Sequence, residues 1–354
     1  MIILHTETLK HWGGQQNRIL KEAIGLIQKG HRVIIVCNRR SILAQKAKGN
    51  GIKTYEVRMR ERAYLQIPKL IDIIRKENID IVCTHSSLDS WAGGLAAKLT
   101  RRKLVRFRHN LFPIGKNLFA KFIYSIPDRI VAISSSIRDV LIRNGLRGEK
   151  ISVIPSGVDI NIFQPDVEDI RMELNIPSGT LILGNTSTFT KVKGQEFLLT
   201  AFNRIYKKFP CILLLAGRVS DKSKYLSYVD KELEDKILFL GHREDIPRVL
   251  KTIDIFIFPS INEGLGTALL EAMAMERPVL VSDIPTFREF IIDGVNGLFF
   301  KVGNPEDIEE KIYLLIRDRH LRDILGKNAR KTISERFSIE TMIEKTEQLY
   351  KEIY

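Results

Sequence analysis

The chain has 354 residues, of which 44% are hydrophobic and 28% are charged, and this length and composition exclude a disordered tail or a mini-protein. No apolar run approaches the roughly 20 residues that span a bilayer, and the first residues lack the basic and apolar regions of a secretory signal. Only three cysteines occur (Cys37, Cys83 and Cys211). We therefore expect a cytoplasmic protein with reduced thiols.

The formal net charge of +14 is unevenly distributed. Residues 1–165 contain 29 basic and 12 acidic side chains, whereas residues 166–354 contain 27 basic and 30 acidic ones. The first half therefore carries all of the excess positive charge. This asymmetry favours an anionic partner for that half, namely nucleic acid, an acidic membrane surface or a phosphorylated substrate. A basic surface that serves only solubility is the alternative.

Short apolar runs rich in β-branched residues alternate with amphipathic stretches from the start of the chain. A strand at 2–4, a helix at 15–29 and a strand at 33–37 set this pattern. Further strands are predicted at 79–83, 103–107, 129–132 and 151–154. The alternation predicts a mostly parallel sheet with helices on both faces.

A polar stretch with prolines at 159–179 interrupts the pattern, which then restarts. The second set of predicted strands is 180–184, 211–216, 237–240, 254–258, 279–282 and 297–300, and three helices follow at 305–318, 320–335 and 338–351. We predict an α/β protein with two doubly wound, Rossmann-like domains and a ligand cleft between them. The predicted boundaries are 1–158, 159–340 and a final helix, 341–354, that crosses back towards the first domain.

The strand at 254–258 ends in a glycine-rich loop that leads into a helix. Gly264 and Gly266 let the backbone approach a ligand closely, and the amides at the helix start favour an anion such as a pyrophosphate. Glu263 stands at the strand end. Glu271 lies one helical step from Thr267, where its carboxylate can accept hydrogen bonds from the hydroxyls of a ribose. A solvated helix carboxylate is the alternative for Glu271.

These residues resemble the donor site of the family four retaining glycosyltransferases, in which seven residues separate two glutamates. Other segments with the order expected of that family are 12–15, 29–33, 154–163, 193–194, 239–242 and 293–298. The resemblance covers nearly the whole chain. It implies the GT-B fold, two Rossmann-like domains that face a central cleft, with a nucleotide-sugar bound mainly by the second and an acceptor mainly by the first.

By this resemblance Glu263 binds hydroxyls of the donor sugar, Glu271 binds the ribose, and Lys193 neutralises the departing diphosphate, where negative charge develops. The remaining predicted donor-binding residues are Gly184, Thr188, Gly264, Leu265, Gly266 and Thr267.

The sequence departs from the family pattern at two positions. Thr188 stands where the family usually has an arginine, and Lys191 and Arg218 are the candidates to replace that charge. Glu276 stands where the family usually has a glycine at a helix exit. For Glu276 we expect a strained or altered helix end without catalytic meaning.

His109 follows the strand at 103–107, and the strand-end rule places it at the ligand-binding edge. The resemblance supports a role for His109 near the donor sugar and the reacting centre, and a structural histidine is the alternative. The predicted catalytic residues are therefore His109, Glu263 and Lys193. The family implies retention of configuration at the transferred sugar, and no residue is assigned as a covalent nucleophile.

The predicted acceptor-binding residues all lie in the first half of the chain. They are Gly13, Gly14, Ser87, Asp89, Arg106 and Arg108. Arg106 and Arg108 alternate with Phe107 on a strand, so they share one face and can meet phosphates. For Ser87 and Asp89 the alternative is ordinary N-capping of a helix.

The segment 111–126 combines aromatic residues with Lys116 and Lys121. Leu118, Phe119 and Phe122 have the spacing of one apolar helical face. That face packs against the first sheet or, alternatively, enters the headgroup region of an anionic membrane. The second interpretation predicts peripheral binding to the cytoplasmic face of the inner membrane and a lipid-linked or phosphorylated glycan acceptor.

We therefore predict a retaining hexosyl- or heptosyltransferase that uses a nucleotide-sugar in lipopolysaccharide or cell-envelope glycan synthesis. One alternative is another GT-B enzyme, such as a nucleotide-sugar epimerase or a phosphorylase. The other is a non-catalytic nucleic-acid-binding protein, for which the sequence shows no recognition motif. We expect no metal, because no Asp-x-Asp or clustered His/Cys set lies near the proposed phosphates. We also expect no cofactor and no nucleic-acid partner.

Overall fold

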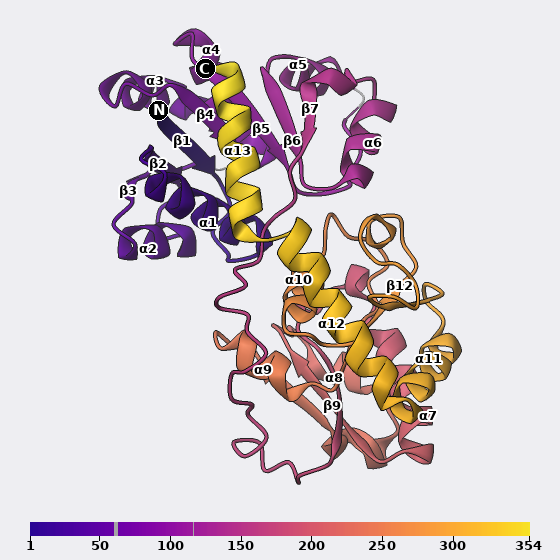
Figure 1. The fold of residues 1–354 in the computed structure, drawn as a ribbon. Helices are drawn as coiled ribbons and strands as arrows, with labels where there is room; N and C mark the ends of the chain where they lie inside the picture. Colours follow the sequence, from indigo (N-terminus) through magenta and orange to yellow (C-terminus); the bar gives the residue numbers. More distant parts are fainter. Residues whose placement is uncertain (60–62, 116) are drawn as a thin grey trace. The chain divides into compact units, whose positions relative to one another are not determined.

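The computed structural model describes residues 1–59, 63–115 and 117–354. The chain forms two compact units, one of residues 1–157 with 339–354 and one of residues 158–338. Each unit is a parallel sheet with helices on both faces (Figure 1). The prediction of two doubly wound α/β domains is confirmed. None of the described helices is both long and apolar enough to cross a membrane.

The first unit contains a seven-stranded sheet in the order β3-β2-β1-β4-β5-β6-β7, with all neighbours parallel. Its strands are β1 (Ile2–Glu7), β2 (Arg32–Cys37), β3 (Lys53–Glu56), β4 (Ile81–Thr84), β5 (Lys103–Arg108), β6 (Arg129–Ala132) and β7 (Ile151–Val153). Its helices are α1 (Gly14–Gln28), α2 (Ile42–Gly49), α3 (Ile67–Lys76), α4 (Ser87–Leu99), α5 (Leu118–Ser125), α6 (Ser135–Arg143) and α13 (Ile339–Ile353). Short 3₁₀ turns lie at η1 (Ala63–Gln66) and η2 (Gly148–Lys150).

The sequence analysis missed the edge strand β3. None of its four residues is fully buried, so it lacks the apolar run that marks the inner strands.

Alternating residues of the inner strands fill two cores in the first unit. Ile3 and Ile35 pack on the face that α1 and α13 cover, whereas Leu4 and Ile34 pack on the face that α3 and α4 cover. Figure 1 shows α13, the yellow end of the chain, beside α1. At their contact a Cβ on Gly25 would lie 1.9 Å from Cδ1 of Ile343, so a larger residue there would force the Ile343 side chain to move.

The second unit contains a six-stranded parallel sheet in the order β10-β9-β8-β11-β12-β13. Its strands are β8 (Leu181–Asn185), β9 (Cys211–Ala216), β10 (Ile237–Gly241), β11 (Ile255–Phe258), β12 (Val279–Ser282) and β13 (Leu298–Phe300). Its helices are α7 (Gln195–Lys208), α8 (Lys222–Leu226), α9 (Ile246–Thr252), α10 (Thr267–Ala274), α11 (Pro305–Arg317) and α12 (Arg319–Arg336), with 3₁₀ turns η3 (Lys191–Lys193), η4 (Lys231–Lys236) and η5 (Phe287–Glu289).

The polar stretch before β8 belongs to the second unit. Ile170 N–H donates to Thr252 Oγ1 at 2.9 Å, and Arg171 pairs with Asp254 at 2.9 Å. Phe163 is also held there, because its carbonyl accepts from Arg330 at 2.8 Å.

Each sheet has one place where the direction of strand addition reverses. These switch points are the β1/β4 pair in the first unit and the β8/β11 pair in the second. Loops at the carboxyl ends of such a pair diverge and leave room for a ligand. The topology therefore directs attention to the segments that follow β1, β4, β8 and β11.

Candidate functional site

Lys193 and Glu263 meet at the switch point of the second unit. Lys193 follows β8 and Glu263 follows β11, and Lys193 Nζ lies 2.6 Å from Glu263 Oε1. Ser260 Oγ donates to the same carboxylate oxygen at 2.7 Å, and Thr286 Oγ1 donates to the Glu263 carbonyl at 2.7 Å. Two residues that the sequence analysis assigned to catalysis are thus brought into direct contact, with the carboxylate held by Ser260 and the backbone of Glu263 held by Thr286.

Two glycines allow this close arrangement of loops. Gly194 has φ +64°, and a Cβ there would lie 2.1 Å from the Pro259 carbonyl oxygen. Gly266 has φ +89°, and a Cβ there would lie 2.9 Å from the Phe287 ring. Gly266 is also the N-cap of α10 and supplies no side-chain acceptor. The first amides of α10 therefore offer a suitable environment for an anion.

Glu271 lies on α10 one turn beyond Thr267, and both side chains are half-buried. Gly264 is half-buried in the preceding loop, while the Leu265 side chain is 3% exposed. A donor contact at Leu265 therefore has to involve its backbone.

Thr188, Lys191 and Arg218 are all exposed near the ends of β8 and β9. Neither Lys191 nor Arg218 forms an ion pair with any described carboxylate. The Phe189 N–H donates to the Arg218 carbonyl at 2.9 Å, so the loops after β8 and β9 are adjacent. Lys191 and Arg218 therefore stay candidates for the positive charge that the family's usual arginine carries and that Thr188 lacks.

Gly184 has a packing role that the sequence analysis did not consider. It lies within β8, and a Cβ would lie 2.4 Å from Ile253 Cδ1 and 3.1 Å from the Leu214 carbonyl oxygen. A side chain at this position would disrupt the packing of the sheet. Its assignment to the donor site stays a prediction.

Three histidines form a hydrogen-bonded row across the carboxyl ends of β1, β4 and β5. His5 Nδ1 lies 3.0 Å from His85 Nε2, and His85 Nδ1 lies 3.1 Å from His109 Nε2. Phe107 stacks on His85 with ring centroids 4.6 Å apart. Burial lowers the pKa of all three histidines below the ordinary value, so the rings are neutral near pH 7.

The row has a direction because each contact needs one N–H and one lone pair. Glu22 pairs with Arg18 at 3.4 Å and lies 3.9 Å from His5 Nε2, so its negative charge favours the proton on that nitrogen. With the His5 proton on Nε2, His5 Nδ1 accepts from His85 Nε2, and His85 Nδ1 accepts from His109 Nε2. His109 is left with a lone pair on Nδ1, which can accept a hydrogen bond from a hydroxyl.

Glu7 is a buried acid that the sequence analysis missed. It ends β1 at the first switch point, is 0% exposed, and accepts from the backbone N–H groups of Thr8 (2.7 Å) and Leu9 (2.9 Å) and from Gln16 Nε2 (2.9 Å). Burial, with the charge of Asp89 second, raises its pKa to about 7. Its position at the last residue of β1, three residues after the apolar run at 2–4, is the signal that could have identified it.

Asp89 forms a capping box at the start of α4. It is 0% exposed and accepts from the backbone N–H groups of His85 (2.8 Å) and Ser86 (2.7 Å) and from Thr6 Oγ1 (2.8 Å). This enclosure supports N-capping, the alternative that the sequence left open for Asp89, and its direct contact with an acceptor stays a prediction. Ser87, one residue after the cap, is exposed.

The other predicted acceptor residues lie at two places in the first unit. Gly13 and Gly14 begin α1, and Gly13 is extended, with φ −163°. Arg106 and Arg108 lie on the α4-covered face of β5, opposite the histidine row. Both arginines are buried. Lys116 lies outside the described residues.

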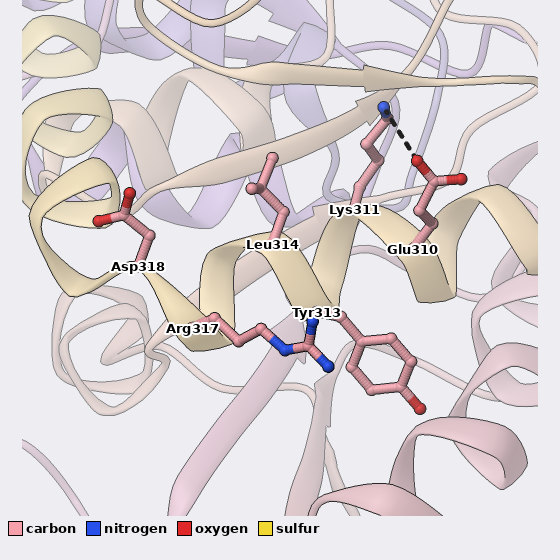
Figure 2. Close-up of a pocket in the computed structure, with 6 residues that line it drawn as sticks. All are labelled: Glu310, Lys311, Tyr313, Leu314, Arg317 and Asp318. Carbon is pink, nitrogen blue, oxygen red and sulfur yellow. Dashed lines mark ion pairs between the residues drawn. The ribbon is translucent and has the colours of Figure 1, made fainter.

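A hollow of about 480 Å³ on the C-terminal half of α11 does not belong to either switch point. Figure 2 shows its side chains fanning out from this one helix, with Lys311 paired to Glu310. The helix that follows a parallel strand runs back from the carboxyl edge, so these residues lie towards the opposite edge. The hollow is thus separate from the strand-end sites.

Within the described ranges, no group of three His, Cys, Asp or Glu side chains is placed to hold a metal, and metal independence stays a prediction.

Comparison with known proteins identifies the family. Residues 166–332 match the family described as "Glycosyl transferases group 1", and residues 12–162 match "Glycosyltransferase Family 4". The chain belongs to the group 1 glycosyltransferases. A crystal structure of a glycosyltransferase from Rickettsia africae ESF-5 is similar to this glycosyltransferase, with a TM-score of 0.90 and 27% identity over 99% of this chain and 98% of that one.

Other proteins are also similar to this glycosyltransferase. The N-acetyl-alpha-D-glucosaminyl L-malate synthase of Bacillus anthracis is 25% identical over 93% of this chain and 91% of its own length. An Escherichia coli enzyme named UDP-Gal:alpha-D-GlcNAc-diphosphoundecaprenol alpha-1,3-galactosyltransferase is 27% identical, covering 79% and 77%. HepE of Anabaena, crystallised with UDP and glucose, shares the fold, with a TM-score of 0.86 and 21% identity over 99% of both chains. These neighbours confirm the GT-B fold class.

Proposed function

We propose that this glycosyltransferase moves a hexosyl or heptosyl group, with retention of configuration, from a nucleoside diphosphate sugar to a lipid-linked or saccharide acceptor. The pathway we propose is cell-envelope glycan synthesis, of which lipopolysaccharide is one form, at the cytoplasmic face of the inner membrane. The observation that carries the proposal is the contact of 2.6 Å between Lys193 and Glu263 at the β8/β11 switch point.

That contact supplies the two kinds of group that a nucleotide-sugar requires. The Lys193 ammonium group and the first amides of α10 are proposed to stabilise the negative charge that develops on the leaving diphosphate. A carboxylate beside it accepts hydrogen bonds from sugar hydroxyls. Glu271, farther along α10, is proposed to bind the ribose.

His109 is proposed to accept a hydrogen bond from a hydroxyl of the transferred sugar through the Nδ1 lone pair. The row of His5 and His85 holds its Nε2 proton and so fixes the ring orientation.

Calorimetric titration with UDP, GDP, ADP and CMP tests the donor site. UDP comes first, because the Escherichia coli relative is named for UDP-Gal and the HepE crystal contains UDP. We expect one nucleoside diphosphate to bind selectively at moderate salt. We expect Glu271→Ala and Lys193→Ala to weaken that binding about tenfold or more. The matched control is Lys327→Ala, which removes an exposed lysine on α12 of the same unit.

Equal binding of all four nucleotides that disappears with added salt would contradict the proposed donor site, since it would indicate non-specific charge attraction. Transfer assays with the selected nucleotide-sugar then compare Glu263→Gln with the wild type. We expect a roughly 10²- to 10³-fold loss of turnover with the nucleotide affinity retained.

A further inference from the structure

Two buried arginines in the first unit have no acidic partner. Arg106 is 4% exposed and Arg108 is 8% exposed. Neither guanidinium forms an ion pair with any carboxylate in the part of the chain that the structure describes. Buried arginines are ordinarily paired with an acid, because a desolvated cation is costly. The two cations therefore need a different source of negative charge.

Neutral groups hold the arginines in place. The Arg106 guanidinium stacks on Tyr124, with Cζ 3.6 Å from the ring centroid, and donates to the Ile123 carbonyl at 3.3 Å. Arg108 donates to Tyr124 Oη at 2.7 Å and to the Phe112 carbonyl. Arg108 Nε is buried and has no hydrogen-bond partner among the described residues. The side chains are thus positioned, and at least one donor stays available.

Burial and mutual repulsion make this pair of cations unfavourable without an anion. Burial lowers the pKa of Arg106 and of Arg108, and the neighbouring Arg108 charge lowers that of Arg106 further, whereas Tyr124 raises the pKa of both and the more distant Asp89 raises that of Arg106. A bound anion would satisfy the remaining donors and offset both penalties. Paired guanidinium groups suit a phosphate oxygen arrangement especially well.

The arginines line a pocket of about 220 Å³ at the carboxyl ends of β4 and β5. Ser87 at the start of α4 and Asn117, the N-cap of α5, contribute polar groups to its wall. Trp91 and Phe119, whose ring centroids lie 6.3 Å apart, form an apolar wall. One side of the pocket thus suits an anion and the other suits a hydrocarbon.

The apolar wall continues onto an exposed surface around α5. Phe119 belongs to the pocket wall and to this surface. The most exposed apolar side chains of the surface are Phe112 (68%), Leu118 (81%), Phe119 (72%) and Phe122 (49%). An exposed aromatic cluster beside a cationic pocket fits an amphiphile with a charged head and an apolar chain.

We propose that the Arg106/Arg108 pocket binds the phosphate or diphosphate of a lipid-linked acceptor, with the first part of the lipid chain against Trp91 and Phe119. The assignment of the phosphate to an acceptor rests on the proposed transferase function. The anion pocket itself rests only on the buried arginines and their surroundings.

Binding of geranyl diphosphate, inorganic diphosphate and geraniol to the full chain tests this proposal by calorimetry. We expect geranyl diphosphate to bind more tightly than inorganic diphosphate, because only it reaches the apolar wall, and geraniol not to bind. Titrations are made in saturating UDP, or in the nucleotide selected above, so that the donor site is occupied. Abolition of binding by the nucleotide would overturn the assignment to this pocket.

Substitutions then show which residues bind geranyl diphosphate. Arg106→Gln and Arg108→Gln should each weaken geranyl diphosphate roughly tenfold to hundredfold. Arg143→Gln, which removes an exposed arginine from α6 of the same unit, should leave it unchanged. Phe119→Ser should reduce only the preference for geranyl diphosphate over inorganic diphosphate. Melting temperatures of all variants show whether they are folded, and unchanged affinity in both folded pocket variants would refute the proposal.

Vesicle binding distinguishes a pocket that binds an acceptor phosphate from one that binds a membrane headgroup. Flotation with phosphatidylcholine vesicles, with and without phosphatidylglycerol, is compared between the wild type and Arg108→Gln. We expect the substitution to leave vesicle binding unchanged while geranyl diphosphate affinity falls. Loss of vesicle binding with unchanged geranyl diphosphate affinity would overturn the proposal. Failure of the proposed transferase function would instead appear as absent nucleotide binding with the pocket intact.

Discussion

Glu7 and the three histidines of the first unit give the pH dependence of stability two opposite contributions. Burial raises the pKa of Glu7 to about 7, and the native state therefore keeps a proton that the unfolded chain loses above its ordinary value of 4.5. Burial lowers the pKa of His5, His85 and His109, so the native state resists protonation that the unfolded chain accepts below about pH 6.5.

Glu7→Gln isolates the first contribution. In the wild type, the free energy of unfolding loses a Glu7 contribution of about 3 kcal/mol as the pH rises from about 4.5 to 7. Glutamine does not ionise, so the variant should gain stability relative to the wild type over that interval. Urea unfolding of both proteins across this pH range measures the difference. Glu149→Gln, at an exposed position, is the control, and a difference that does not vary with pH would contradict the buried acid.

His85→Phe tests whether the histidine row positions His109. Phenylalanine retains a ring for the stack on Phe107, but it removes both hydrogen bonds of His85. We expect a tenfold or larger loss of transfer rate, unchanged nucleotide affinity and a change in the nitrogen NMR shifts of His109. Exposed His11→Gln serves as the control. Native His109 shifts in the variant would show that the row does not set its tautomer.

The exit of helix α10 depends on close packing against α12. Glu276, where the family usually has glycine, adopts a left-handed φ of +57°. Its carbonyl oxygen faces Gly326 of α12, where a Cβ would lie 2.2 Å away. The predicted strain at Glu276 is thus present, and the glycine that this contact requires lies on the neighbouring helix instead.

Gly326→Ala should destabilise the second unit by about 1–3 kcal/mol. The added Cβ meets a backbone atom that no rotamer change can move, and this cost exceeds the gain of about 1 kcal/mol in helix propensity. Chemical denaturation measures the effect. Gly49→Ala in α2 is the control because nothing lies within 4 Å of its Cβ position, and equal stability changes in the two variants would rule out the packing argument.

At the scale of the whole molecule, the last sixteen residues complete the first unit after the chain has built the second. Residues 339–354 are grouped with residues 1–157. The core residues that α13 supplies are Met342, Ile343, Leu349, Tyr350 and Ile353. Tyr350 Oη also donates to Glu22 at 2.8 Å. Five buried side chains at about 1.5–3 kcal/mol each approach the whole stability of a typical domain.

Removal of residues 339–354 should therefore unfold the first unit and leave the second folded. Differential scanning calorimetry of the truncated chain should show the loss of one transition. Titration should show that nucleoside diphosphate binding is retained, since the predicted donor residues all lie in residues 158–338. Retention of both transitions would show that α13 is dispensable for the first core.

The fold could be predicted because its signals are local. The inner strands are apolar on both faces, and they alternate with amphipathic helices, so their periodicity identifies each element without knowledge of its neighbours. The edge strand β3 lacks that signal and was missed. The contact between Lys193 and Glu263 could be anticipated only in part, since the strand-end rule predicts the edge of the sheet and not which side chains touch.

The sequence by itself determined the α/β class, the two-part organisation and the residues at the strand ends, because hydrophobic periodicity and glycine-rich loops depend on residues near one another in the chain. Only the tertiary structure decided which polar groups are enclosed. It enclosed Asp89 in a helix cap, gave Glu7 a raised pKa and left Arg106 and Arg108 buried without an ion pair to any described carboxylate. Burial and electrostatic partners are set by segments distant in sequence, so no local pattern predicts them.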